Sequence, residues 1–313
     1  MTDQAEKLRS LVQNRTKDQP EPVDILEARK QQLIQPSLSR PKLSARVIAI
    51  TSGKGGVGKT NVAINIAIHM RRQGKRVVML DTDFGLANIE VLFGVNPKYN
   101  FGDVLSGLVS IEAAMSTGPM GVQFLSGGSG LTALSNITEE QMAVLVDSFS
   151  FLNEMADIIL IDTGAGVSKS VVNFVKAAQE AIVVTTPDPT SVTDAYALIK
   201  TVKDTCLQEE LPEFKLIVNR VDSPSEGVDV YEKLGGVCGR FLGIRLSSLG
   251  NIPHDPHLTK AVKKQQPVSL MFPNTDSARC LEAIANKLLD MKPVGKKAGL
   301  RSFVLKLVGR LGN

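Results

Sequence analysis

The 313-residue sequence contains few aromatic side chains: it has no tryptophan, three tyrosines and eleven phenylalanines. Proteins that bind single-stranded nucleic acid without sequence preference stack the bases on aromatic rings, so this composition argues against that class. The sequence also lacks a signal peptide and an apolar run of membrane-spanning length, and we therefore expect a cytosolic protein. Hydrophobic residues still make up 43% of the chain, which is enough for a large core.

Cysteine and histidine are also scarce. The three cysteines are Cys206, Cys238 and Cys280. They are too far apart to form a Cys-x-x-Cys pair, which disfavours an iron–sulfur carrier and predicts reduced thiols. Of the three histidines, His254 and His257 flank Asp255 in a proline-bounded stretch, and this pattern predicts a turn rather than a metal site.

The most specific motif is a glycine-rich octet formed by Gly53, Lys54, Gly55, Gly56, Val57, Gly58, Lys59 and Thr60. Such glycines let backbone N–H groups turn inward around phosphates, while Lys59 neutralises the β and γ oxygens and the Thr60 hydroxyl ligates magnesium. A strand-like apolar run precedes the loop and helically spaced apolar residues follow it. This order places the phosphates at a helix N-terminus, where the helix dipole favours negative charge.

The loop contains a second lysine near its start, Lys54. This lysine restricts the set of phosphate-loop proteins that the sequence can resemble. With it, the sequence resembles the deviant Walker A ATPases of the MinD/ParA class from about Val47 to Leu289. The resemblance implies ATP and Mg²⁺ as cofactors and hydrolysis of ATP to ADP and phosphate. It also implies an ATP-dependent homodimer in which Lys54 reaches the nucleotide of the partner. A solvated loop lysine is the alternative.

The strand-like runs follow one another in a regular order, at 47–51, 76–81, 121–125, 158–162 and 181–186. A further run at 215–221 and a weaker one at 239–244 extend the series, and helical patterns separate most of them. This alternation predicts an α/β fold with a wound, mostly parallel sheet flanked by helices, and the resemblance specifies a MinD-like P-loop NTPase. Ligands of such sheets bind at the carboxyl ends of the strands.

Carboxylates stand at two of these strand ends. Asp81 and Asp83 close the second strand, and without the upstream loop they would fit a turn or helix cap equally well. The resemblance makes Asp83 the residue that orients the attacking water, whereas Asp81 supports the magnesium shell. Asp162 ends the fourth strand, within reach of a magnesium-bound water. Gly164 takes a position that is often proline in this class, and its N–H would sense the γ-phosphate.

The base site depends on the resemblance alone. The resemblance implies that Asn219, at the end of one strand, and the backbone near Pro253, after a later strand, hold the adenine. An asparagine at a strand end is otherwise an ordinary turn residue.

Two sections precede the ATPase part. Residues 18–45 contain four prolines among polar residues and predict an extended linker. Residues 1–17 carry an Asp-Gln-Ala-x-x-Leu-Arg pattern formed by Asp3, Gln4, Ala5, Leu8 and Arg9. This pattern resembles the N-terminal segment of the FlhG family of flagellar number regulators. The resemblance implies that the segment binds the signal-recognition-type GTPase FlhF and stimulates its hydrolysis, with Gln4 nearest the partner's active site. A terminus without a role is the alternative.

Residues 292–313 follow the ATPase part (46–291) and include no acidic residue. Helical spacing places one apolar face on Leu300, Phe303, Val304, Leu307, Val308 and Leu311. A basic amphipathic helix of this kind lies in the interface of an anionic bilayer, and two of them in a dimer bind more strongly than one. The alternative is a final helix packed on the core.

Together these features predict an ATP-dependent, membrane-associating switch that controls flagellar number or placement. Its implied partners are FlhF, the switch (C-ring) proteins and the inner face of the cell membrane. A MinD-like division-site regulator and a ParA-like DNA-partitioning ATPase are the alternatives. The net charge of +4 superficially favours DNA, but much of it lies in the tail, so direct nucleic-acid binding is not expected.

Overall fold

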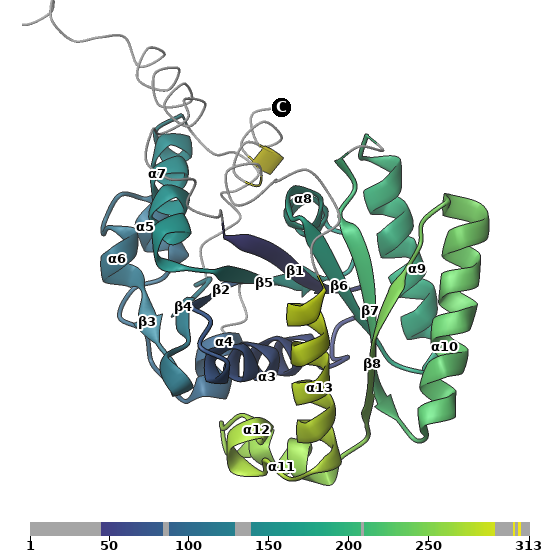
Figure 1. The fold of residues 1–313 in the computed structure, drawn as a ribbon. Coiled ribbons are helices and arrows are strands. Elements are labelled where there is room, and N and C mark those ends of the chain that lie inside the picture. Colours follow the sequence, from purple (N-terminus) through teal and green to yellow (C-terminus); the bar gives the residue numbers. More distant parts are fainter. Residues whose placement is uncertain are drawn as a thin grey trace, which may run out of the picture.

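The computed structural model describes residues 45–83, 88–128, 139–207, 210–291, 303 and 306–307. Its centre is an eight-stranded sheet with the order β3-β4-β2-β5-β1-β6-β7-β8 (Figure 1). The strands are β1 (Arg46–Ser52), β2 (Val77–Thr82), β3 (Ser116–Thr117), β4 (Gln123–Leu125), β5 (Ile158–Ala165), β6 (Glu180–Thr185), β7 (Glu213–Val221) and β8 (Ser247–Pro253). All neighbours pair in parallel except β3 and β4, which pair antiparallel at one edge. The predicted fold class is confirmed.

Helices cover both faces of the sheet. One face packs against α5 (Phe101–Leu105), α6 (Ile111–Ala114), α7 (Glu139–Met155), α8 (Lys169–Ala177), α9 (Pro189–Asp204) and α10 (Pro224–Val237). The other face packs against α3 (Lys59–Arg72), α4 (Asn88–Phe93), α11 (Pro256–Lys263), α12 (Val268–Met271) and α13 (Asp276–Asp290). Two short irregular helices, η1 (Pro119–Gly121) and η4 (Cys238–Leu242), complete the described elements.

This two-sided cover explains the sequence of the central strands. In β1, Val47 and Ala49 join the core on the side of α7 to α10, whereas Ile48 and Ile50 join the core on the side of α3 and α13. A strand buried on both faces reads as a continuous apolar run instead of an alternating one. The five strands in the middle of the sheet therefore come from the apolar runs at 47–51, 76–81, 158–162, 181–186 and 215–221.

The last predicted strand, 239–244, is wrong. Most of this stretch lies in η4, a π-helix, and the eighth strand is β8. β8 is an edge strand in which only Leu249 and Ile252 are buried, so its apolar pattern is too sparse to predict a strand. The fourth predicted strand is correct but too short, because β5 continues beyond Asp162 to Ala165.

A charged cluster lies at the amino-terminal ends of three strands. The Arg46 guanidinium bonds the Glu180 carboxylate at 2.5 Å, and the Lys215 ammonium lies 2.7 Å from the same carboxylate and 2.8 Å from Glu213. Burial alone would raise the pKa of Glu180, but the two cations hold it below the usual value. Arg46 also donates to the carbonyl of Leu288, so this cluster fastens the end of α13 to the sheet.

Part of the C-terminal tail is packed on the core. Phe303 and Leu307 are fully buried, and the Phe303 ring lies 5.3 Å from Phe149 of α7 and 6.4 Å from Phe174 of α8, measured between ring centroids. These residues show the tail in the packed arrangement, which is the alternative to a membrane-bound helix. The other predicted membrane residues (Leu300, Val304, Val308 and Leu311), the segment 1–17 and the linker up to residue 44 lie outside the described residues.

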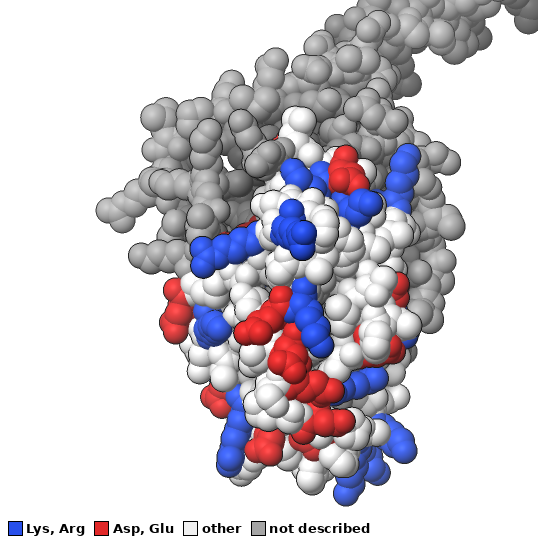
Figure 2. Space-filling model, turned by 90° about the vertical axis from the view of Figure 1, so that its right-hand side faces the viewer, with Lys and Arg blue, Asp and Glu red and all other residues white. Residues whose placement is uncertain are grey.

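The surface that carries α9, α10 and β8 holds side chains of both charges. Figure 2 shows acidic side chains gathered in the middle of this face with basic ones around them. Its α10 contributes Glu226, Asp229 and Glu232. This described face therefore carries no continuous basic surface.

Candidate nucleotide-binding site

The phosphate-binding loop joins β1 to α3 in the predicted order. Gly58 precedes the first turn of α3 in the left-handed conformation, with φ of 92°. A side chain at Gly53 would lie 2.1 Å from the backbone of Asp194 in α9, and one at Gly58 would lie 2.5 Å from Asn219. Only glycine fits at these two positions, so the loop is held close to both α9 and β7.

The two carboxylates predicted for the metal site come together at the ends of adjacent strands, where Asp81 of β2 pairs with Asp162 of β5. The Lys59 ammonium donates to one Asp162 oxygen at 2.5 Å and the Thr60 hydroxyl donates to the other at 2.7 Å. A hydroxyl and two buried carboxylates form the oxygen donor set that Mg²⁺ prefers. The residues present therefore fit this ion.

The charge balance supports the same conclusion. Burial, together with the nearby charge of Asp162, raises the pKa of Asp81 to about 7. Within the described residues Lys59 is the one cation whose charge offsets this effect on Asp81. Two carboxylates sharing one ammonium leave the site short of positive charge, which a divalent cation would supply.

These protein groups can fill only part of a magnesium shell. No group of three or more His, Cys, Asp or Glu side chains within the described residues could hold a metal ion by itself. Magnesium sites of this type complete their octahedron with water and phosphate oxygens. When bound, the ion would supply positive charge that offsets the negative charge developing during phosphoryl transfer. Thr60, Asp81 and Asp162 would hold it.

Asp83 directly follows β2 and lies close to Gly164 of β5. Its backbone N–H donates to Asp81 at 3.0 Å, and the Asn88 amide donates to its carboxylate at 3.2 Å. A side chain at Gly164 would come within 3.3 Å of the same carboxylate, so the loops after β2 and within β5 meet here. Burial raises the pKa of Asp83, and the nearby Lys59 opposes that shift. Asp83 and Gly164, which were predicted separately, thus lie close together.

Lys54 is engaged within its own chain. Its ammonium donates to the Asp188 carboxylate at 3.0 Å and to the Thr190 hydroxyl at 2.5 Å. The hydrogen bond from Lys54, together with those that the Thr190 N–H and hydroxyl donate to the Asp188 carboxylate, lowers the pKa of Asp188 to about 2. Lys54 and Asp188 are both nearly half exposed, so the lysine can exchange this partner for another anion.

Asn219 and Pro253 also meet beside the loop. Both line a pocket of about 510 Å³ that also includes Gly58 and Asn61 at the start of α3. The Asn219 amide donates to the Val57 carbonyl at 2.8 Å and thereby ties β7 to the loop. The volume lies within the usual range of small-molecule pockets, and the position next to the phosphate loop suits the base and ribose of a nucleotide. The two residues named by resemblance alone thus share one pocket.

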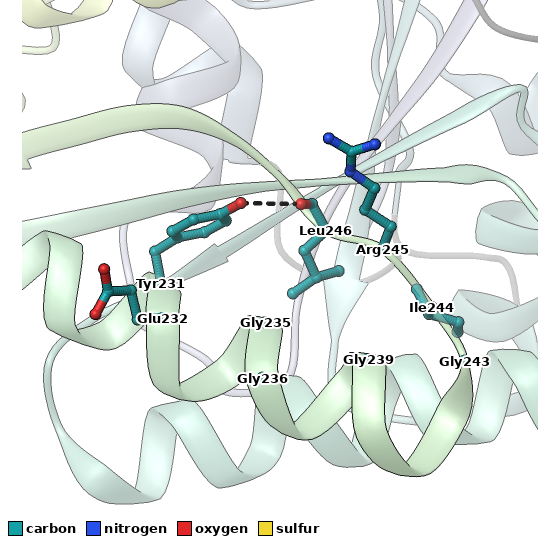
Figure 3. A pocket seen from close by; sticks show the side chains of 9 residues that line it. All are labelled: Tyr231, Glu232, Gly235, Gly236, Gly239, Gly243, Ile244, Arg245 and Leu246. Carbon is teal, nitrogen blue, oxygen red and sulfur yellow. Dashed lines mark hydrogen bonds between the residues drawn. The ribbon is translucent and has the colours of Figure 1, made fainter.

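A second hollow, of about 360 Å³, lies between α10 with η4 and the start of β8 (Figure 3). Its floor includes several glycines, and the Tyr231 hydroxyl donates to the Leu246 carbonyl at 3.2 Å across it. Its charged lining residues, Glu232 and Arg245, have opposite signs. It contains no residue of the phosphate loop, and it is not the nucleotide site.

Three residues of the site are absent from the sequence prediction: Asn88, Asp188 and Thr190. Asp188 caps α9 by accepting the Thr190 N–H, and the Asp-Pro-Thr run that begins this helix is a readable cap signal. That signal predicts the helix start but not the contact with Lys54, which lies more than a hundred positions earlier. Asn88 carries no comparable local signal.

Residues 44–289 match the ParA family model, which is described as an NUBPL iron-transfer P-loop NTPase. The chain is 40% identical over 264 residues to the antiactivator FleN of Pseudomonas aeruginosa, covering 84% of this chain and 93% of FleN. It is 34% identical over 277 residues to the flagellum site-determining protein YlxH of Helicobacter pylori, covering 87% of this chain and 92% of YlxH. Among solved structures, the cell division ATPase MinD of Pyrococcus furiosus superposes with a TM-score of 0.64 at 25% identity, over 79% of this chain and 100% of that one.

Proposed function

This chain belongs to the ParA/MinD family of P-loop ATPases, and from that premise we propose that it is an ATP-dependent switch controlling flagellar number or placement. The observation that carries the proposal is the match to two relatives with flagellar names over more than nine-tenths of their length. Family membership also confirms the class that the phosphate-binding loop predicts. Iron transfer, which the family description mentions, is disfavoured by three separate free cysteines.

Nucleotide would drive the switch through dimerisation. Lys54 lies on the surface and is held by an exposed carboxylate, so a bound triphosphate of a second copy can compete for it. ATP, which carries the γ-phosphate, would favour the dimer, and hydrolysis would return the monomer. In this cycle Lys59 neutralises phosphate oxygens and Asp83 orients the attacking water.

The tail would couple this cycle to the membrane. Phe303 and Leu307 are buried in the structure, so they cannot insert into a bilayer in the same arrangement. We propose that dimerisation releases the tail and that two tails together bind an anionic membrane. In the described part of the chain, no helix has both the length and the apolar character needed to cross a membrane.

The N-terminal segment would act on the GTPase FlhF. The test is GTP hydrolysis by FlhF with the full-length protein, its Gln4→Ala variant and a Gln13→Ala control in the same segment. We expect stimulation by the wild type and by Gln13→Ala, and loss of stimulation in Gln4→Ala. If the wild type leaves FlhF hydrolysis unchanged, the flagellar assignment through this partner is refuted. Switch (C-ring) proteins are the second class of flagellar partner that we propose.

A division-site role is the second candidate. It is favoured by the fold of the Pyrococcus furiosus cell division ATPase MinD, which covers four-fifths of this chain. The Asp-Gln-Ala-x-x-Leu-Arg segment and the proline-rich linker favour the flagellar role, because the division-site class usually begins near its first strand. If the protein does not stimulate GTP hydrolysis by FlhF, the division-site role becomes the favoured candidate.

A further inference from the structure

Arg220 has an unusual backbone. Among the described residues it is one of three non-glycine residues with positive φ, at 59°, together with Met120 and Gln265. The register between β7 and β8 shifts between Asn219 and Val221, so Arg220 occupies a bulge in the strand pair. A left-handed conformation is unfavourable for a residue with a Cβ, and it persists where the surrounding structure enforces it.

The bulge is fastened to the phosphate loop. The Arg220 N–H donates to the side-chain oxygen of Asn219 at 3.0 Å, while the Asn219 amide nitrogen donates to Val57 in the loop. On the other side, the His254 N–H donates to the Val221 carbonyl at 3.0 Å and holds the end of β8. Bulges beside active sites redirect a side chain out of the regular alternation of the strand.

The redirected side chain lines the base pocket. Arg220 borders the same 510 Å³ pocket as Gly58, Asn61 and Pro253, yet it is exposed. Its guanidinium has no hydrogen bond or ion pair within the described residues. Of the described residues that line the pocket, His254 alone carries an aromatic ring, and none is Phe, Tyr or Trp. A purine base in this pocket would therefore find no large aromatic side chain among these residues to stack on.

A guanidinium can take the place of a large aromatic side chain. It is planar, more weakly hydrated than an ammonium, and it stacks on aromatic faces with added cation–π attraction. We propose that the Arg220 guanidinium stacks on the adenine of the bound nucleotide and is a base-binding residue of this site. Arg220 can do so only if the chain binds ATP as proposed above.

The positive φ provides a clean test of this role. Arg220→Gly removes the guanidinium but suits the left-handed backbone, so the bulge is retained and the fold is not strained. Gln265→Gly is the matched control, because it makes the same kind of backbone change at φ of 53° outside the lining of the pocket. Arg220→Lys retains the positive charge but lacks the planar guanidinium. Thermal unfolding of each variant verifies that it is folded.

The measurement is the Kd of the full-length protein for ADP and for inorganic tripolyphosphate, which has no base. We expect Arg220→Gly to weaken ADP binding by roughly 3- to 30-fold and to leave tripolyphosphate binding unchanged. Arg220→Lys should resemble Arg220→Gly, and Gln265→Gly should resemble the wild type.

Two results would overturn the stacking role. One is unchanged ADP binding in Arg220→Gly, and the other is an equal loss for ADP and tripolyphosphate, which would assign Arg220 to the phosphates. A wild-type protein that does not bind ADP at all would instead refute the nucleotide site itself.

Discussion

At the scale of single residues, the predicted metal site is built around two carboxylates that share one lysine. Asp81 and Asp162 are almost completely buried side by side, and Lys59 bonds only Asp162 among them. A buried carboxylate in such a place resists ionisation, which is why the pKa of Asp81 rises to about 7. The nucleotide-free site therefore stores unfavourable charge that Mg²⁺ and nucleotide would relieve.

Removing this charge should stabilise the nucleotide-free protein. Because the folded-state pKa of Asp81 lies above its unfolded value of 3.8, the free energy of unfolding falls as pH rises from about 4 to about 7 and stays low above that. A shift of this size corresponds to roughly 4 kcal/mol as an upper figure. We expect Asp81→Asn to raise the Tm at pH 8 above that of the wild type and to reduce the extra stabilisation by Mg²⁺ and ADP.

The control for this measurement is Asp157→Asn, because the pKa of Asp157 is shifted in the opposite direction from that of Asp81. A hydrogen bond from Arg76 lowers the pKa of Asp157, so its ionised form stabilises the fold above its unfolded pKa and this stability is lost in acid. Asp157→Asn should therefore lower the Tm at pH 8. Equal losses of Tm in both variants would contradict the conclusion that the ionised Asp81 carboxylate destabilises the folded protein.

At the scale of elements, the tail is bound by an aromatic contact. Phe303 packs against Phe149 of α7 and Phe174 of α8. Both of these rings also line a small cavity that Asp81 borders. Aromatic pairs add about 0.5–1.5 kcal/mol to the area that they bury. The equilibrium between a packed and a free tail should respond to a change in either ring.

A conservative change in α7 should shift this equilibrium. Phe149→Leu preserves an apolar core residue but loses the ring contact, and a loss of about 1 kcal/mol raises the free-tail population roughly fivefold. We expect a similar increase in co-sedimentation of the nucleotide-free protein with anionic lipid vesicles. Phe124→Leu is the control, because Phe124 is equally buried on the other face of the sheet, against Phe93. If both variants bind vesicles equally, the packed tail does not limit membrane binding.

At the scale of the whole molecule, Lys54 is the residue that we propose to connect the fold with dimerisation. The loop that carries it is held against α9, and its ammonium is bound by Asp188 and Thr190 of the same chain. Dimerisation as proposed exchanges these partners for the nucleotide of the second copy. Lys59, the lysine predicted to bind nucleotide in its own subunit, is buried and takes no part in this proposed exchange.

The two lysines can be separated by mutation. We expect Lys54→Ala to remain monomeric in sedimentation velocity with a non-hydrolysable ATP analogue, while its Kd for ADP stays within about threefold of the wild type because Lys59 is retained. Lys233→Ala removes an exposed lysine of α10 instead and should dimerise normally. Dimerisation of Lys54→Ala at wild-type concentrations of protein and analogue would refute the role of Lys54 across the interface.

The sequence by itself determined the fold class, the position of the phosphate loop and the position of Asp81, Asp83 and Asp162 near or just after the ends of strands. These features are readable because phosphate and magnesium chemistry require particular residue types at short, fixed spacings, and because strands buried on both faces form continuous apolar runs. Tertiary structure alone decided four features: the ion pair between Lys54 and Asp188, the bulge at Arg220, the packing of Phe303 on the core and the position of β8. Each of these depends on contacts between residues far apart in the chain, as in the bond from Asn219 to Val57, and no local pattern encodes such contacts.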